Sequence, residues 1–170
     1  NDCVAIGSYA MDGTLTSNAS GSVAIGYNAL TALTSGINNV AVGYQSLDAN
    51  QTSDYNTAVG HSALSGVNGD GGGHNTGVGR VAGLSLTDGT GNTYMGSGAG
   101  YYNSTGDNNT YMGLSAGQGA SGQSNSNNTG VGSSALTAVT TGSANVAIGA
   151  EALDELQTGS NNVALGYAAL

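Results

Sequence analysis

Ten glycines recur along the chain at almost constant spacing, and each ends a short apolar string such as V-A-I-G or V-A-V-G. Neighbouring glycines stand 17 or 19 residues apart, and the longer interval comes first in every set of three. These anchor glycines are Gly7, Gly26, Gly43, Gly60, Gly79, Gly96, Gly113, Gly132, Gly149 and Gly166. Three units therefore make a super-repeat of 53 residues. Such phasing predicts one repeat domain over residues 1–170 and argues against a disordered linker.

The residues before each anchor glycine alternate in size. In N-V-A-V-G, large apolar residues stand one and three places before the glycine, and this period of two predicts a β-strand. A second short segment follows the glycine, as in Tyr44–Leu47, and Gly-rich turns separate the units. Two short strands and two turns describe one coil of a parallel β-solenoid. We therefore predict an all-β fold, a β-roll of about ten 17- or 19-residue coils stacked about 4.8 Å apart.

Two columns of this repeat are expected to pack tightly. The residue directly before each anchor is a medium or large apolar side chain, which we expect in the core: Ile6, Ile25, Val42, Val59, Val78, Met95, Met112, Val131, Ile148 and Leu165. Three residues after the anchor stands Ala in nine units and Ser46 in the tenth, so that position has no room for bulk. The two additional residues of each longer coil should form bulges along one side of the rod.

A third column carries asparagine. Asn stands four residues before the anchor in eight of the ten units, and Cys3 and Ser22 replace it in the first two. The eight are Asn39, Asn56, Asn75, Asn92, Asn109, Asn128, Asn145 and Asn162. Stacked amides can hydrogen-bond along such a column, so we predict a structural Asn ladder. A preference of Asn for turns explains its abundance but not its fixed phase. Asn103 lies outside the column and is expected in a solvated loop.

Charge and composition exclude several classes of function. The net charge is −9 and Arg80 is the single Lys or Arg, so neither nucleic acid nor an anionic membrane surface is expected as a partner. No apolar stretch is long enough for membrane insertion. Cys3 is alone, so an internal disulfide is excluded. His61 and His74 fall in different columns, which gives no nucleophile–base pair, and we predict neither enzymatic activity nor a cofactor.

Three weaker patterns leave other binding activities open. Tyr94 and Tyr111 replace a small residue in neighbouring units, with Tyr101 and Tyr102 between them; this cluster predicts either a glycan-stacking patch or a local widening of the rod. Thr occupies the place three before the anchor in five consecutive units, which would suit an ice-binding face, although Val and Thr also exchange there by shape. The acidic residues do not recur in one column with the regularity of calcium-binding repeats, so calcium between loops would be adventitious.

The lean coils predict association. A coil with one large aliphatic, one Val or Thr, one Ala and often one Leu buries little apolar surface against the entropy of ordering so much glycine. Closed threefold association would use both faces of each strand. The rival interpretation is a single-chain solenoid that polymerises end to end into an extracellular filament.

The strings S-V-A-I-G-Y-N-A-L, N-N-V-A-V-G-Y-Q-S-L and N-N-V-A-L-G-Y-A-A-L resemble the head repeats of trimeric autotransporter adhesins and, more closely, the related 17-residue arrays of phage tail-fibre proteins. The resemblance covers the whole chain. It implies a left-handed parallel β-roll in each subunit, a homotrimer, and an extracellular location on a virion or a bacterial surface. The coil is longer than in the autotransporter pattern, and no membrane anchor, neck or chaperone domain is recognisable.

The predicted function is accordingly a structural fibre or adhesin segment that gives reach and multivalent surface attachment. Its expected partners are further copies of itself and a cell-surface glycan or protein. An ice- or glycan-binding solenoid is the minor alternative.

Overall fold

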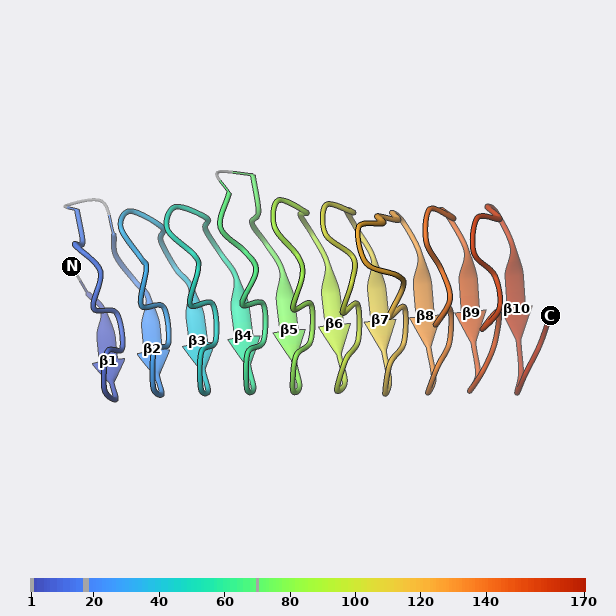
Figure 1. Ribbon diagram of the computed structural model, residues 1–170, viewed down its shortest axis with the longest axis horizontal. Helices are drawn as coiled ribbons and strands as arrows, with labels where there is room; N and C mark the ends of the chain where they lie inside the picture. Colours follow the sequence, from blue (N-terminus) through green and yellow to red (C-terminus); the bar gives the residue numbers. More distant parts are fainter. Residues whose placement is uncertain (1, 17–18, 70) are drawn as a thin grey trace.

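The computed structural model describes residues 2–16, 19–69 and 71–170. Every coil contributes one three-residue strand to a single parallel sheet, and the strands lie side by side in chain order (Figure 1). The strands are β1 (Val4–Ile6), β2 (Val23–Ile25), β3 (Val40–Val42), β4 (Thr57–Val59), β5 (Thr76–Val78), β6 (Thr93–Met95), β7 (Thr110–Met112), β8 (Thr129–Val131), β9 (Val146–Ile148) and β10 (Val163–Leu165). The chain is therefore an all-β solenoid, as the repeat predicts.

The pairing of the strands follows the repeat without a slip. Val4 of β1 pairs with Val23 of β2, and Val40 of β3 pairs with Thr57 of β4, so equivalent residues of successive units lie beside one another. Between β4 and β5, where the interval is 19 residues, the connecting loop rises above the loops on either side (Figure 1). A bulge is therefore present at this longer coil, whereas the loop between β7 and β8, which has the same interval, does not rise above its neighbours (Figure 1).

The segment after each anchor glycine differs from the prediction. It is a run of turns rather than a second strand, because every second residue has a left-handed backbone, as at Gln45 (φ 51°) and Leu47 (φ 49°). The N–H of Gln45 donates to the carbonyl of Tyr27 in the preceding coil (2.9 Å), and the N–H of Leu47 donates to Ala63 in the following coil (3.1 Å). These hydrogen bonds tie the coils together without extended backbone.

The direction of the strand side chains corrects a second expectation. From β2 to β10 the middle residue of each strand is buried in the coil, and Ala24, Ala41 and Ala147 are fully buried. The residue directly before the anchor points outward instead, and Ile25 is 37% and Ile148 42% exposed. The period of two was correct, but the interior takes the middle residue of each strand, which is Ala or Gly except at Tyr94 and Tyr111, so the residues on either side of it face away from the interior.

The interior is filled from the opposite side of the coil. Large side chains come from the places four and seven after the anchor; those fully buried are Leu30, Leu33, Leu47, Leu64, Val67, Leu86, Leu136 and Val139. The alanines three after the anchor are also fully buried from Ala29 to Ala135, in agreement with the predicted close packing. The core is therefore a single file of Leu or Val facing Ala.

The anchor glycines are required by geometry. Gly43 has φ +140°, a conformation that L side chains rarely adopt, and a Cβ added there would lie 2.3 Å from the carbonyl oxygen of Gly60 in the next coil. The other anchors from Gly7 to Gly149 share this close approach to the next anchor. A side chain in this column would separate two coils, which explains why the sequence repeat is most exact here.

Candidate functional site

The asparagine column forms a continuous chain of hydrogen bonds inside the rod. Asn92 is fully buried; its Nδ2 donates to Asn75 Oδ1 (3.1 Å) and to the Gly106 carbonyl (2.8 Å). Its Oδ1 accepts from both the backbone N–H and the Nδ2 of Asn109, each at 3.0 Å. The backbone N–H of the next Asn donates to the preceding Oδ1 at every step from Asn39 to Asn162. The column therefore joins the coils through side chains as well as backbone.

The first two units show how this column accepts other residues. Ser22 is buried, and its Oγ accepts a hydrogen bond from the N–H of Asn39 (3.1 Å), so a hydroxyl oxygen replaces the amide oxygen as the acceptor. Cys3 is a half-buried free thiol packed against the core. Both residues are small enough to fit the position.

Tyr94 and Tyr111 do not form the surface patch that would bind a glycan. Both lie fully buried inside the coil, with their rings stacked at 5.8 Å. Space for them exists because Gly100 and Gly117 replace the leucine found at the same place in other coils; a Cβ at Gly100 would lie 2.6 Å from the Tyr94 ring. The two tyrosine rings thus fill the interior of their coils in place of the missing leucine. Tyr101 and Tyr102 pack edge to face at 4.5 Å and are half-buried.

The two buried hydroxyls are held in a polar network. Asn103 donates from Nδ2 to the Tyr94 hydroxyl (3.1 Å), and the Tyr111 hydroxyl donates to Asn125 Oδ1 (2.5 Å). Asn103 is 1% exposed, so the expectation of a solvated loop residue was wrong. Burial raises the pKa of both phenols above the ordinary value, since the interior disfavours the phenolate.

The outward face of the sheet is an apolar stripe along the rod. It consists of the residues one and three before each anchor: a large aliphatic, and a Val or Thr. Away from the two ends, each of these side chains is half-buried or exposed, with Val59 at 38%, Met95 at 39% and Met112 at 38%. Charged residues are absent from both columns. We call this surface the outer sheet face.

A row of stacked aromatic side chains borders the outer sheet face beside the anchor glycines. The rings of Tyr27 and Tyr44 stack at 5.3 Å, and those of Tyr44 and His61 at 5.0 Å. Tyr9 meets Tyr27 edge to face at 5.8 Å. All of these side chains are exposed, and they extend the apolar surface around the edge of the rod.

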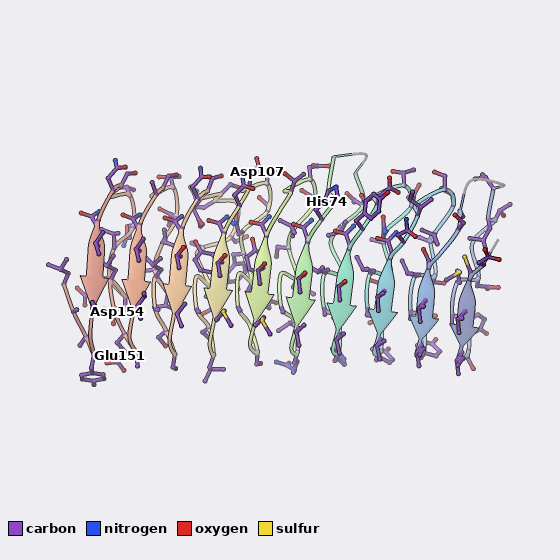
Figure 2. All side chains as sticks on the ribbon, turned by 180° about the vertical axis from the view of Figure 1, so that it is seen from behind. His74, Asp107, Glu151 and Asp154 are labelled. Atoms are coloured by element: carbon purple, nitrogen blue, oxygen red, sulfur yellow. The ribbon has the colours of Figure 1, made fainter. Side chains whose placement is uncertain are left out.

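The opposite edge, where the loops enter the strands, carries a small pocket. Tyr55 and His74 stand at equivalent places of adjacent coils, with their rings stacked at 4.9 Å. The pocket beside them, about 240 Å³ in volume, is lined by Thr52, Asp54, Tyr55, Gly71, Gly73, His74 and Thr90. Figure 2 shows His74 and Asp107 at this loop edge. The sequence signal that could have predicted this pocket is the pair of aromatic residues that stand five places before successive anchor glycines.

The carboxylates at the loop edge cap backbone groups. Asp54 Oδ1 accepts the N–H of Ile37 (2.7 Å), and Asp107 Oδ1 accepts the N–H of Thr90 (2.7 Å). Within residues 2–16, 19–69 and 71–170, no three His, Cys, Asp or Glu side chains gather as a metal site would require. The same described residues contain no helix long and apolar enough to cross a membrane.

Comparison with known proteins gave no match: no family model, no curated protein and no solved structure resembles this chain closely enough to be significant.

Proposed function

We propose that the chain is a non-enzymatic segment of an extracellular homotrimeric fibre, in which copies of the chain cover one another's outer sheet face. The observation that carries this proposal is the uncharged, apolar character of that face over the ten strands. Parallel sheets are normally covered on both sides, and here one side has no cover within the chain.

The size of the face supports the proposal. With strands about 4.8 Å apart and a strip about 10 Å wide, ten strands present on the order of 500 Å² of sheet surface. Continuous apolar patches above a few hundred Å² on soluble proteins generally mark interaction sites. The stacked tyrosines and His61 at the neighbouring edge add to this area. A second copy has the same repeat and therefore matches this surface in length and period.

The resemblance to trimeric adhesin heads and phage tail-fibre arrays favours three copies over two. A closed threefold arrangement lets each outer sheet face meet two others around one axis. The fibre would be stiff, because every coil is hydrogen-bonded to the next along its sheet and its Asn column. Its role would be to hold a binding end away from a virion or a bacterial surface and to present it in several copies.

Sedimentation equilibrium tests this assembly. The wild-type chain of 16.4 kDa should sediment at about 49 kDa at micromolar concentration. Met95→Asp with Met112→Asp puts two carboxylates on the outer sheet face, and we expect at least a hundredfold weaker association. Asn68→Asp, at an exposed position in the loop between β4 and β5, adds charge away from that face and should leave the mass unchanged. A wild-type monomer, or equal masses for the two variants, would contradict the proposal.

One observation favours a second candidate function. Thr57, Thr76, Thr93, Thr110 and Thr129 are the first residues of five consecutive strands and are all half-buried on the outer sheet face. A regular hydroxyl array of this kind could order water in an ice-like spacing. This function needs the face to be free, so a monomer that shapes ice crystals at micromolar concentration would support it and exclude the trimer.

A further inference from the structure

We propose that the Asn68–Gly69 peptide is a modification site, at which the Asn68 side chain spontaneously loses ammonia and becomes aspartate or isoaspartate. The site lies in the loop between β4 and β5, in one of the longer coils. This inference goes beyond the fibre proposal and does not rest on it, because both residues belong to one loop of one chain.

The reaction needs an asparagine side chain and a free main-chain nitrogen in the residue after it. The nitrogen of Gly69 attacks Cγ of Asn68, so that a C–N bond forms, and the bond from Cγ to Nδ2 breaks as ammonia leaves with the proton of the attacking nitrogen. Water then opens the cyclic succinimide at either carbonyl, which gives aspartate or isoaspartate. The first step joins two groups of one dipeptide, so proximity alone favours it and no cofactor is required.

The first argument is that hydrogen bonds protect the other exposed asparagines. Among the described residues, the exposed asparagines are Asn38, Asn68, Asn108, Asn127 and Asn161. All except Asn68 stand directly before a member of the asparagine column. The N–H of that member donates to the column residue of the preceding coil, as Asn128 does to Asn109 Oδ1 (3.0 Å). This bond fixes the nitrogen, which is then not free to approach the side chain before it.

The second argument is that the nitrogen of Gly69 is free. Its N–H has no acceptor among the residues that the structure describes. Gly69 has no side chain to shield the nitrogen, and glycine gives the backbone its widest choice of conformations. Asn68 itself is exposed and lies outside the strands, so its amide can turn toward this nitrogen.

The third argument is that the fold keeps a glycine after Asn68. The side chain of Asp88 in the next coil lies against Gly69, in the space that a Cβ would take. The carbonyl of Gly69 accepts a hydrogen bond from Ser53 Oγ in the same coil. Packing at Gly69 therefore excludes a side chain that would slow the reaction, while it leaves the nitrogen open.

Mass spectrometry of the folded chain is the first test. After incubation at neutral pH, the protein is unfolded and cut with trypsin, which cleaves after Arg80, the single Lys or Arg. Fragment 1–80 contains Asn68, and fragment 81–170 contains Asn108, Asn127 and Asn161. We expect fragment 1–80 to gain about one mass unit, as an amide becomes an acid, while fragment 81–170 keeps its mass. No gain in fragment 1–80, or equal gains in both fragments, would overturn the proposal.

Fragmentation spectra and labelling by isoaspartyl methyltransferase locate and identify the product. The new acid should stand at position 68 and should include isoaspartate, because water opens the ring at either carbonyl. A gain at another asparagine, or aspartate as the sole product, would contradict the proposal. Asn68→Gln is the matched variant, since it keeps an amide but would have to close a larger ring. Its fragment should keep its mass over the same time, and a gain equal to that of the parent would show that the reaction occurs elsewhere.

Asn128→Gly separates the effect of the free nitrogen from that of the Asn-Gly sequence. The variant places glycine after the exposed Asn127, but the N–H at position 128 still faces its acceptor, Asn109 Oδ1. In the folded variant, we expect Asn127 to react at least about tenfold more slowly than Asn68. In urea the two Asn-Gly pairs should react at similar rates. Equal rates in the folded variant would refute the selection of Asn68 by its free nitrogen.

The parent chain provides the same comparison without a substitution, should circular dichroism show that Asn128→Gly does not fold. Unfolding in urea should raise the rate at Asn127 and leave the rate at Asn68 nearly unchanged. A ratio of rates that is the same in the folded and unfolded parent would contradict protection by the asparagine column.

Discussion

Replacing Asn92 by Leu tests whether the asparagine column holds the coils together. The variant removes the acceptor of the Asn109 N–H (3.0 Å) and the donor to the Gly106 carbonyl (2.8 Å). Both bonds are buried, and no other protein partner substitutes for either in this region of the structure. Leu also places a branched apolar group where a flat amide now fits.

The expected cost follows from these two losses. Each buried group left unpaired costs about 1 to 3 kcal/mol, and the apolar transfer of Leu returns about 1 to 2 kcal/mol. The middle of these ranges gives a net destabilisation of about 2.5 kcal/mol, which for a chain of this length lowers the melting temperature by roughly 5 to 10 °C. The amide proton of Asn109 should also exchange with solvent much faster than in the parent.

Asn68→Leu is the matched control. Asn68 is exposed and belongs to no column of the repeat, so the same substitution should change stability by less than about 0.5 kcal/mol. Thermal melting followed by circular dichroism, together with amide exchange, measures both variants. If Asn92→Leu has the same melting temperature as Asn68→Leu, and the Asn109 amide proton stays protected from exchange, the asparagine column does not stabilise the stack of coils.

Three further predictions concern the interior. Gly100→Leu should destabilise the chain by more than about 3 kcal/mol, because its Cβ would lie 2.6 Å from the Tyr94 ring. Adding Tyr94→Ala should recover much of this loss, since it restores the Ala and Leu pair of other coils. Thermal melting of the two single variants and the double variant checks this, and additive losses would contradict it. Ala99→Leu should lower the free energy of unfolding by about 1 to 3 kcal/mol because it overpacks a fully buried site, whereas Ala120→Leu at an exposed site should leave stability unchanged. Equal melting temperatures for the two variants would contradict tight packing at Ala99. Because burial raises the folded-state pKa of Tyr94 and Tyr111 above 10.0, stability should be intact below pH about 10 and fall as the pH rises further. Tyrosinate absorbance should show these two phenols ionising only as the chain unfolds. Ionisation of all nine tyrosines in the folded state would contradict this prediction.

Much of the fold could be predicted because the repeat makes one coil a template for all the others. The fixed phase of the anchor glycines identified the parallel stacking, and the pairing of Val40 with Thr57 shows the same 17-residue step. The chemistry of the Asn column also followed from phase. These features depend on neighbouring coils alone, and the sequence contains those neighbours.

The direction of side chains was harder to predict. Alternation placed Val40 and Val42 on one face of a strand and Ala41 on the other, but it could not say which face turns inward. The usual rule buries the larger side chains, and here the coil reverses it. The reversal becomes clear only when Leu47 and Leu33 are seen to fill the interior from the other side.

The sites at the surface depended on contacts that cross several columns. Tyr94 was placed among ligand-binding residues because its size is unusual for its column, although Gly100 in the same coil makes room for it. The pairing of a large residue with a glycine six places later is visible in the sequence once the coil geometry is known. The loop-edge pocket needed the stacking of Tyr55 on His74, which combines two coils and a loop.

The distance between spin labels on the outer sheet face tests the central claim most directly. Cys3→Ser removes the native thiol and copies Ser22 of the same column, after which Val78→Cys places one label on β5. Facing sheets lie about 10 Å apart, so pulsed dipolar spectroscopy should find labels within roughly 25 Å of one another in nearly every molecule, with the three-spin effects of a trimer. Isolated labels without dipolar coupling at micromolar concentration would show that the face is free and would contradict the account.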